Sequence, residues 1–173
     1  MNNATTIAMY DMILHSLVDA SYLSRLHSRA VAGGLFFLGD VDQPTKIDGI
    51  ILAFSAIIPC VVASAGEAEY ATLFAGAQNA AALRTVFSDL GYPQPDTIIL
   101  CDNTKAIGIA TDSVKQKRSK AIDMRFHWVR DRVRQKQFRI AYIASAENPA
   151  DYFTNNLPQE AYSRFLSYIA SAP

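Results

Sequence analysis

A capped helix start joins two very different stretches of this chain. Residues 50–62 form a strongly apolar run, and residues 67–90 form a long alanine-rich segment with helix composition. Between them, Ser64 and Glu67 have the spacing of a capping box, in which a Ser hydroxyl and a Glu side chain satisfy each other's free backbone donors. Glu69 falls in the first turn, where the helix dipole favours an anion. The pattern predicts a helix from Glu67 to Leu90 with acidic residues at its start.

The other segments alternate between strand-like and helix-like patterns. Strands are expected at 12–18, 31–38, 49–56, 97–101 and 138–143. Helices are expected at 103–110, 119–136 and 158–169, with a further helix start at Asn148-Pro149. Residues 20–30 predict a turn or loop, and Gly33-Gly34 predicts a bulge or a close backbone approach. Three successive strands on short connections favour an antiparallel meander. The order predicts an α/β fold with a mixed sheet covered by helices.

Length and composition predict one domain. The chain has 173 residues, and half of them are hydrophobic, which is enough to bury a core. We expect a flexible segment at 1–11, the main domain at 12–157 and a C-terminal helix packed on it within 158–173.

No membrane or secretion signal is visible in the sequence. Apolar runs stay below the roughly 20 residues of a membrane span, and the N-terminus has no basic lead. Cys60 and Cys101 lie inside apolar runs, which fits a reducing compartment. We therefore expect an intracellular protein, cytoplasmic or nuclear, with no signal peptide, no transmembrane segment and no membrane partner.

Acidic residues occupy similar places in this expected fold. Asp19 and Asp102 follow apolar strands, Asp151 begins a helix, and Glu67 and Glu69 open the long helix. Sites in open α/β sheets form at the carboxyl ends of strands, so Asp19 and Asp102 would be neighbours on adjacent parallel strands. Converging carboxylates suit hard divalent cations, and a pair of such ions serves phosphoryl transfer. Spacing alone leaves open that these are ordinary acids at element ends.

Positive charge is concentrated in one segment. Ten of the sixteen Lys and Arg residues lie between Lys115 and Arg139, although the net charge of the chain is zero. A basic segment beside an acidic site suggests a polyanion partner. The alternative is a solvated helix face.

Six short motifs occur in order along the chain. They are residues 18–22 (VDASY), 28–34 (SRAVAGG), 67–70 (EAEY), 101–103 (CDN), 118–127 (RSKAIDMRFH) and 148–154 (NPADYFT). Together they resemble the ribonuclease H domain of copia-type LTR retrotransposons, a domain associated with reverse transcriptase. The resemblance covers about residues 12–157.

This resemblance implies the ribonuclease H-like fold, a five-stranded mixed sheet of order 3-2-1-4-5 with strands 1–3 antiparallel, flanked by helices. It also implies a metal-dependent endoribonuclease that hydrolyses the RNA strand of RNA–DNA hybrids with two Mg²⁺ ions, for which Mn²⁺ can substitute. The family's four catalytic, metal-binding acids match Asp19, Glu69, Asp102 and Asp151, which leaves Glu67 as the capping residue. The implied partners are an RNA–DNA hybrid and a reverse transcriptase domain in a parent polyprotein.

Candidate substrate contacts lie beside the acids and in the basic segment. They are Ser21, Asn103, Lys115, Lys117, Arg118 and Lys120. Asn103 could reach an RNA 2′-hydroxyl, and its alternative role is a helix cap. The basic residues would contact phosphates.

The chain departs from the family pattern at two places. Ala121 stands where many copia-type chains have His, and residues 144–146 (ASA) replace a loop that carries a His in cellular ribonucleases H. The second departure would slow turnover. Two alternatives to the nuclease hypothesis therefore stay open. One is a weak or inactive nucleic-acid-binding or interaction module on the same fold, and the other is an integrase-like strand transferase. The early Glu of the long helix argues against the transferase, which places its Glu late in the chain.

Overall fold

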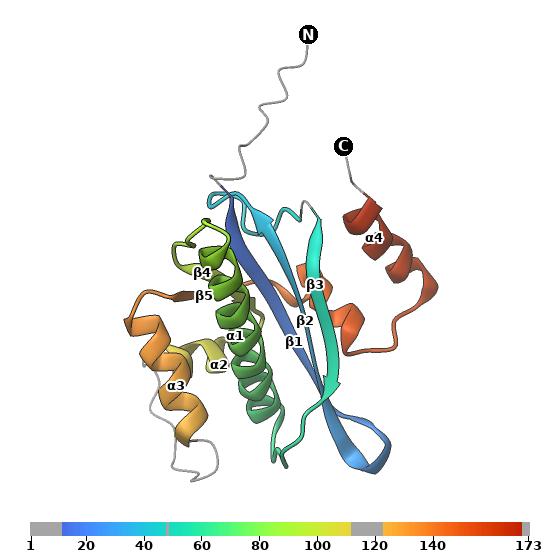
Figure 1. Ribbon diagram of the computed structural model, residues 1–173. Coiled ribbons are helices and arrows are strands. Elements are labelled where there is room, and N and C mark those ends of the chain that lie inside the picture. Colours follow the sequence, from blue (N-terminus) through green and yellow to red (C-terminus); the bar gives the residue numbers. More distant parts are fainter. Residues whose placement is uncertain (1–11, 48, 112–122, 171–173) are drawn as a thin grey trace.

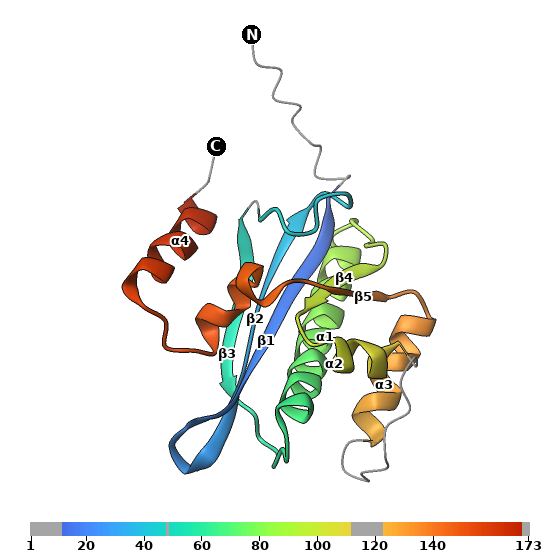
Figure 2. The same ribbon diagram turned by 180° about the vertical axis from the view of Figure 1, so that it is seen from behind.

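The fold is a five-stranded sheet with helical segments on both faces (Figure 1). The computed structural model describes residues 12–47, 49–111 and 123–170. One face carries the helices α1 (Ala65–Asp89), α2 (Thr104–Ala110) and α3 (Asp123–Arg134). The view from behind shows the short 3-10 helix η4 (Pro149–Phe153) and the helix α4 (Gln159–Ala170) on the other side (Figure 2).

The sheet has the predicted topology. Its strands are β1 (Ile13–Arg25), β2 (Arg29–Gly39), β3 (Ile50–Ile57), β4 (Thr97–Cys101) and β5 (Phe138–Tyr142). Their order is β3-β2-β1-β4-β5, with β1, β2 and β3 antiparallel and with β4 parallel to both β1 and β5. This confirms the expected ribonuclease H-like α/β fold.

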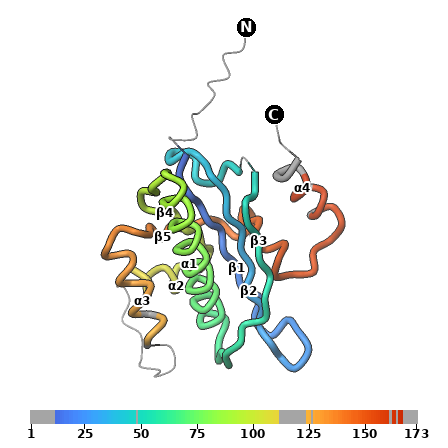
Figure 3. The backbone as a smooth tube through the Cα atoms, in the orientation of Figure 1, coloured from blue at the N-terminus to red at the C-terminus, as the bar shows by residue number. Residues whose placement is uncertain are grey.

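The prediction of a turn or loop over residues 20–30 is wrong. Strand β1 continues to Arg25, the 3-10 helix η2 (Leu26–Ser28) reverses the chain, and β2 begins at Arg29. The resulting hairpin projects away from the helices (Figure 3), so its outer residues stay exposed and need no apolar pattern. The reversal uses His27 and Ser28 at φ values of 61° and 53°, which non-glycine residues rarely adopt. No glycine marked this turn in the sequence.

The start of α1 resembles the predicted capping box. The Ser64 hydroxyl accepts a hydrogen bond from the Glu67 N–H at 3.2 Å. The Glu67 carboxylate accepts from the N–H of Ala63 at 2.7 Å, one residue before the position that the motif predicts. Glu67 therefore acts at the cap, and Glu69, two residues further along α1, takes no part in it.

Two apolar layers hold the sheet between its helical faces. Leu14, Val18 and Phe36 point toward α1, α2 and α3, whereas Leu17, Leu35 and Phe37 pack toward η4. All six side chains are fully buried. Alternate residues of β1 thus face opposite layers, as strand geometry requires.

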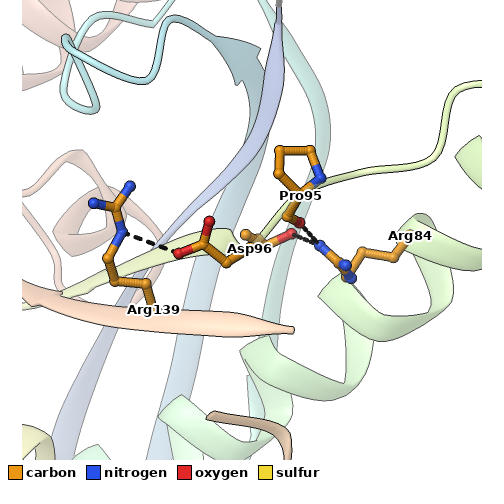
Figure 4. Close-up of polar contacts among 5 residues, drawn as sticks. Arg84, Pro95, Asp96 and Arg139 are labelled. Carbon is orange, nitrogen blue, oxygen red and sulfur yellow. Dashed lines mark hydrogen bonds and ion pairs between the residues drawn. The ribbon is translucent and has the colours of Figure 1, made fainter. Parts of the chain in front are cut away.

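A polar cluster fixes the loop that leads into β4 (Figure 4). Arg84 of α1 donates hydrogen bonds to the Pro95 carbonyl, to Thr97 Oγ1 at 2.9 Å and to the Gln94 carbonyl at 2.8 Å. Asp96 pairs with Arg139 of β5 at 3.4 Å. These contacts tie the start of β4 to both neighbouring elements and so position its far end.

Aromatic side chains connect α4 to η4. Phe165 packs against Tyr152 with the ring centroids 4.6 Å apart and the rings tilted by 32°, and it meets Phe153 edge to face at 5.4 Å. The ring centroid of Tyr162 lies 6.0 Å from that of Tyr152.

The division of the chain at 1–11, 12–157 and 158–173 stays a prediction.

Within residues 12–47, 49–111 and 123–170, no helix combines the length and the apolar character that a membrane crossing requires.

Candidate metal centre

Two of the predicted acids stand side by side in the middle of the sheet. Asp19 lies within β1, where it pairs with Gly33 of β2, and Asp102 directly follows β4. Because β1 and β4 are parallel and Leu17 is in register with Leu100, Asp19 and Asp102 lie at the same level of adjacent strands. The expected neighbourhood is present, but Asp19 sits inside its strand rather than at the strand's end.

The other two acids reach the same place from helical segments. Glu69 projects from the first turns of α1, and one of its carboxylate oxygens lies within 4.8 Å of one from Asp102. Asp151 comes from η4. The charges of Asp19 and Asp102 act on Glu69, and those of Asp102 and Asp151 act on Asp19. The four acids therefore form a group whose charges act on one another. Among the described residues, the ligand atoms that all lie within 4.8 Å of one another include those of Glu69 and Asp102 and not those of Asp19 or Asp151.

Hydrogen bonds tie η4 to β1 beside Asp19. Asn148 caps η4 as predicted, accepting from the Ala150 N–H at 3.1 Å. Its amide also donates to the Val18 carbonyl at 3.0 Å. The Thr154 hydroxyl donates to Asp19 Oδ2. Asp151 lies in the sequence between Asn148 and Thr154, the two residues that bond to β1.

A second contact orients Asp151 itself. Its Oδ1 accepts a hydrogen bond from the side-chain amide of Asn155, which follows directly after Thr154. The segment after η4 therefore supplies one partner to each of two acids, Asp19 and Asp151.

Gly33 allows η4 to approach the sheet. A Cβ at Gly33 would lie 2.7 Å from Thr154 Cγ2, 2.8 Å from Phe153 Cβ and 3.3 Å from the Ala150 carbonyl. Contacts below 3.0 Å leave no room for a side chain. Of the two roles predicted for Gly33-Gly34, the close approach is the one that this contact bears out.

Burial and mutual repulsion change the acidity of the group. Burial raises the pKa of Asp19 to about 6, the charges of Asp102 and Asp151 add to this, and the hydrogen bond from Thr154 opposes it. Burial raises the pKa of Glu69 to about 9, with further contributions from Asp19 and Asp102. Without a counter-ion, Glu69 therefore keeps its proton at neutral pH, whereas Asp19 is mostly ionised there.

The donor set fits a hard divalent cation. Glu69 is 9% exposed, and its Oε2 is buried with no hydrogen-bond partner among the described residues. An unpaired buried carboxylate oxygen is costly, and carboxylate oxygens are the ligands that Mg²⁺ prefers. A cation bound here would satisfy this oxygen and offset the repulsion between the acids.

The predicted substrate residues have mixed outcomes. Ser21 is buried, its hydroxyl donates to the Thr154 carbonyl at 2.9 Å, and it also contacts Ser24 Oγ. Asn103 caps α2, accepting from the N–H groups of Lys105 and Ala106, each at 3.0 Å. Both contacts support structural roles, and substrate contact stays a prediction. Four predicted residues lie outside the described residues: Lys115, Lys117, Arg118 and Lys120.

Sequence reasoning missed the residues that support the acids. Thr154 and Asn155 follow Asp151 at helix-turn spacing, which is the one signal that could have found them. Nothing local indicated that Asn148 reaches β1, 130 residues away in sequence. Cys101 lies inside an apolar run, which gives no signal of a polar site, yet its Sγ lies within 4.8 Å of carboxylate oxygens of Glu69 and Asp102.

The sequence is similar to part of a transposon polyprotein. It is 30% identical over 152 residues to a retrovirus-related Pol polyprotein from transposon TNT 1-94 of Nicotiana tabacum. The match covers 88% of this chain and 11% of the polyprotein, so the chain spans about a tenth of that relative's length. No protein-family model matches the chain.

Two solved structures show the same fold. RNase H1 from the halophilic archaeon Halobacterium salinarum NRC-1 has a TM-score of 0.52 and 22% identity, covering 87% of this chain and 98% of that one. LC11-RNase H1, isolated from compost and solved in complex with an RNA/DNA hybrid, has a TM-score of 0.56 and 16% identity, covering 89% and 99%. The chain therefore has the ribonuclease H fold, and its sequence is similar to part of a retrotransposon Pol polyprotein.

Proposed function

We propose that this chain is a metal-dependent endoribonuclease that hydrolyses the RNA strand of RNA–DNA hybrids. The observation that carries the proposal is the coupled group of Asp19, Glu69, Asp102 and Asp151 on a ribonuclease H sheet. The complex of LC11-RNase H1 with an RNA/DNA hybrid supports the choice of substrate. The relationship to a Pol polyprotein supports a reverse transcriptase domain as a neighbour in the parent protein.

The four acids would hold Mg²⁺, with Mn²⁺ as a substitute. When bound, a pair of such ions activates a water molecule and stabilises the leaving oxygen of an in-line phosphoryl displacement. Asp19 and Asp102, from adjacent strands, would provide the centre of the site. Glu69 and Asp151 would close it from the two helical faces.

The residues around the acids would keep them ionised and in place. Thr154 donates to Asp19 and so favours its carboxylate form. Asn148 and Asn155 fix η4 and Asp151. Ser21 and Asn103 would lie beside the hybrid, and Lys115, Lys117, Arg118 and Lys120 would contact its phosphates. The hybrid would be read by its shape and its 2′-hydroxyls.

Hybrid cleavage by Asp102→Asn tests this function. The substitution removes one anionic ligand with little change in volume, and we expect Mg²⁺-dependent cleavage to fall by about 100-fold or more. Asp89→Asn is the matched control, because Asp89 is an exposed acid at the far end of α1. The measurement is the rate at which products with a 3′-hydroxyl and a 5′-phosphate form.

Equal rates for wild type and Asp102→Asn would refute the assignment. Tight hybrid binding without cleavage at any Mg²⁺ or Mn²⁺ concentration would instead support a non-catalytic binding module.

A further inference from the structure

Cys101 has a side chain of a type that can ligate metals, and the proposed hydrolysis does not use it. It is the last residue of β4, fully buried and directly before Asp102. Its Sγ, one carboxylate oxygen of Glu69 and one of Asp102 all lie within 4.8 Å of one another. One sulfur and two oxygens therefore surround a common space.

A second observation points to a ligand in that space. Glu69 Oε2 is buried and has no hydrogen-bond partner among the described residues, although Glu69 is only 9% exposed. Buried polar atoms are normally paired, and a cation beside Glu69 would pair this one. Burial raises the pKa of the Cys101 thiol to about 12, and the hydrogen bond that the Asn103 N–H donates to Sγ at 3.4 Å opposes this rise. A cation bound here would therefore have to displace the thiol proton.

We propose that Glu69, Cys101 and Asp102 form a binding site for a soft or borderline divalent cation, for which Cd²⁺ and Zn²⁺ are the probes. Thiolate sulfur selects such cations over Mg²⁺, and carboxylate oxygens complete mixed ligand sets. On binding, the Cys101 S–H bond breaks, its proton leaves to solvent, and a sulfur–metal bond forms.

The present separations are close to those that such an ion needs. A tetrahedral Zn²⁺ with about 2.3 Å to sulfur and about 2.1 Å to oxygen has ligand atoms roughly 3.6 Å apart. The three ligand atoms all lie within 4.8 Å of one another, so they would have to approach by at most on the order of 1 Å. The Glu69 side chain has the most torsions of the three and would make most of this adjustment.

The soft-cation site shares Glu69 and Asp102 with the proposed Mg²⁺ centre. A soft cation bound at Cys101 would occupy these two ligands, so the two cations would compete. This consequence rests on the proposed function, whereas binding at Cys101 does not.

Titration of metal-free protein with Cd²⁺ tests the site. Ultraviolet absorbance reports the charge-transfer band of a Cd²⁺–thiolate bond, and calorimetry reports the affinity. The chain has two cysteines, so Cys101→Ser and Cys60→Ser form a matched pair. We expect wild type and Cys60→Ser to show the band at one equivalent. Cys101→Ser should lose it and bind Cd²⁺ on the order of 100-fold more weakly.

The proposal is overturned if wild type shows no band, or if the band follows Cys60 instead of Cys101. Because Cys101→Ser could disturb β4, Glu69→Gln provides a second variant that keeps both cysteines. Its Cd²⁺ affinity should fall by about 10-fold or more, and an unchanged affinity contradicts the site. A Cd²⁺ band in a protein that cleaves no hybrid would support this site while refuting the proposed function.

Discussion

The Thr154 hydroxyl lowers the pKa of the buried Asp19 carboxyl. Burial and two neighbouring carboxylates raise the pKa of Asp19 to about 6, while the hydrogen bond from Thr154 lowers it. The ionised form of Asp19 is the one that would bind a cation, so Thr154 acts as a positioning residue for the proposed site. Its effect should appear in the dependence of the reaction on pH.

Thr154→Val keeps the volume of the side chain and removes the hydroxyl. Without the hydrogen bond, the pKa of Asp19 should rise further, and the acid limb of the pH–rate profile should move to higher pH. The unfolding free energy should fall by about 1–2 kcal/mol, as for a lost buried hydrogen bond. Hybrid cleavage over a pH series and urea unfolding measure the two effects.

The conservative variant Thr154→Ser separates the hydroxyl from the methyl group. It should restore the acid limb to its wild-type position. A profile that stays in place in Thr154→Val would show that Thr154 does not act through Asp19.

At the scale of elements, the site depends on how closely η4 lies against β2. Gly33 pairs with Asp19 across the β1–β2 ladder, and Thr154, Phe153 and Ala150 occupy the space where a Cβ would stand. The same glycine that faces Asp19 thus sets the distance of Asp151 from it. A side chain at position 33 would move Asp151 of η4 away from the acids of the strands.

Gly33→Ala should displace η4 from the sheet. We expect a loss of about 1–3 kcal/mol in unfolding free energy from overpacking, and a fall in hybrid cleavage of roughly 10- to 100-fold from misplacement of Asp151. Gly66→Ala is the control, because Gly66 lies in α1 with nothing within 4 Å of an added Cβ. Full activity in Gly33→Ala would show that the close approach is not needed.

The elements that depend on local patterns were predictable from the sequence. The Ser64 cap, the Asn148 cap and the buried run at 97–101 each carry a local signal, and each is present. The hairpin over 20–30 was missed because residues 23–29 are exposed and show no apolar alternation, although Ala30 at its base is buried. Its turn also uses His27 and Ser28 where a glycine would have been a signal.

At the scale of the whole molecule, the acid group links stability to pH. In metal-free protein, the pKa of Glu69 rises from 4.5 to about 9 through burial and the charges of Asp19 and Asp102. Between these two values the folded state retains a proton that the unfolded state has lost. Stability contributed by this group therefore falls as pH rises from about 4.5 to about 9.

Urea unfolding of metal-free wild type and Glu69→Gln over this pH range measures the effect. The unfolding free energy of wild type should fall relative to that of Glu69→Gln as pH rises, because Gln does not titrate. Added Mg²⁺ should stabilise wild type increasingly at higher pH, since the cation replaces the proton. A relative stability that increases with pH would contradict the burial of an ionisable Glu69 beside two other acids.

The sequence predicts the four acids of the candidate site but not the residues that hold them in place. In the sequence, Asp19, Glu69, Asp102 and Asp151 follow or begin apolar segments and match family motifs, so the sequence alone proposes them, although Asp19 lies inside β1. The contacts of Asn148 with β1 and of Thr154 with Asp19 span more than a hundred residues. Such contacts arise from the packing of η4 against the sheet and leave no periodic signal. The placement of Cys101 Sγ near two carboxylates likewise follows from packing at the end of β4.

A crystal structure of the protein grown with Mn²⁺, with anomalous scattering recorded, tests the central claim most directly. The account predicts anomalous peaks between Asp19, Glu69, Asp102 and Asp151, with carboxylate oxygens of all four residues turned toward them. Mn²⁺ bound only elsewhere, or any of the four carboxylates turned away from an occupied site, would contradict it.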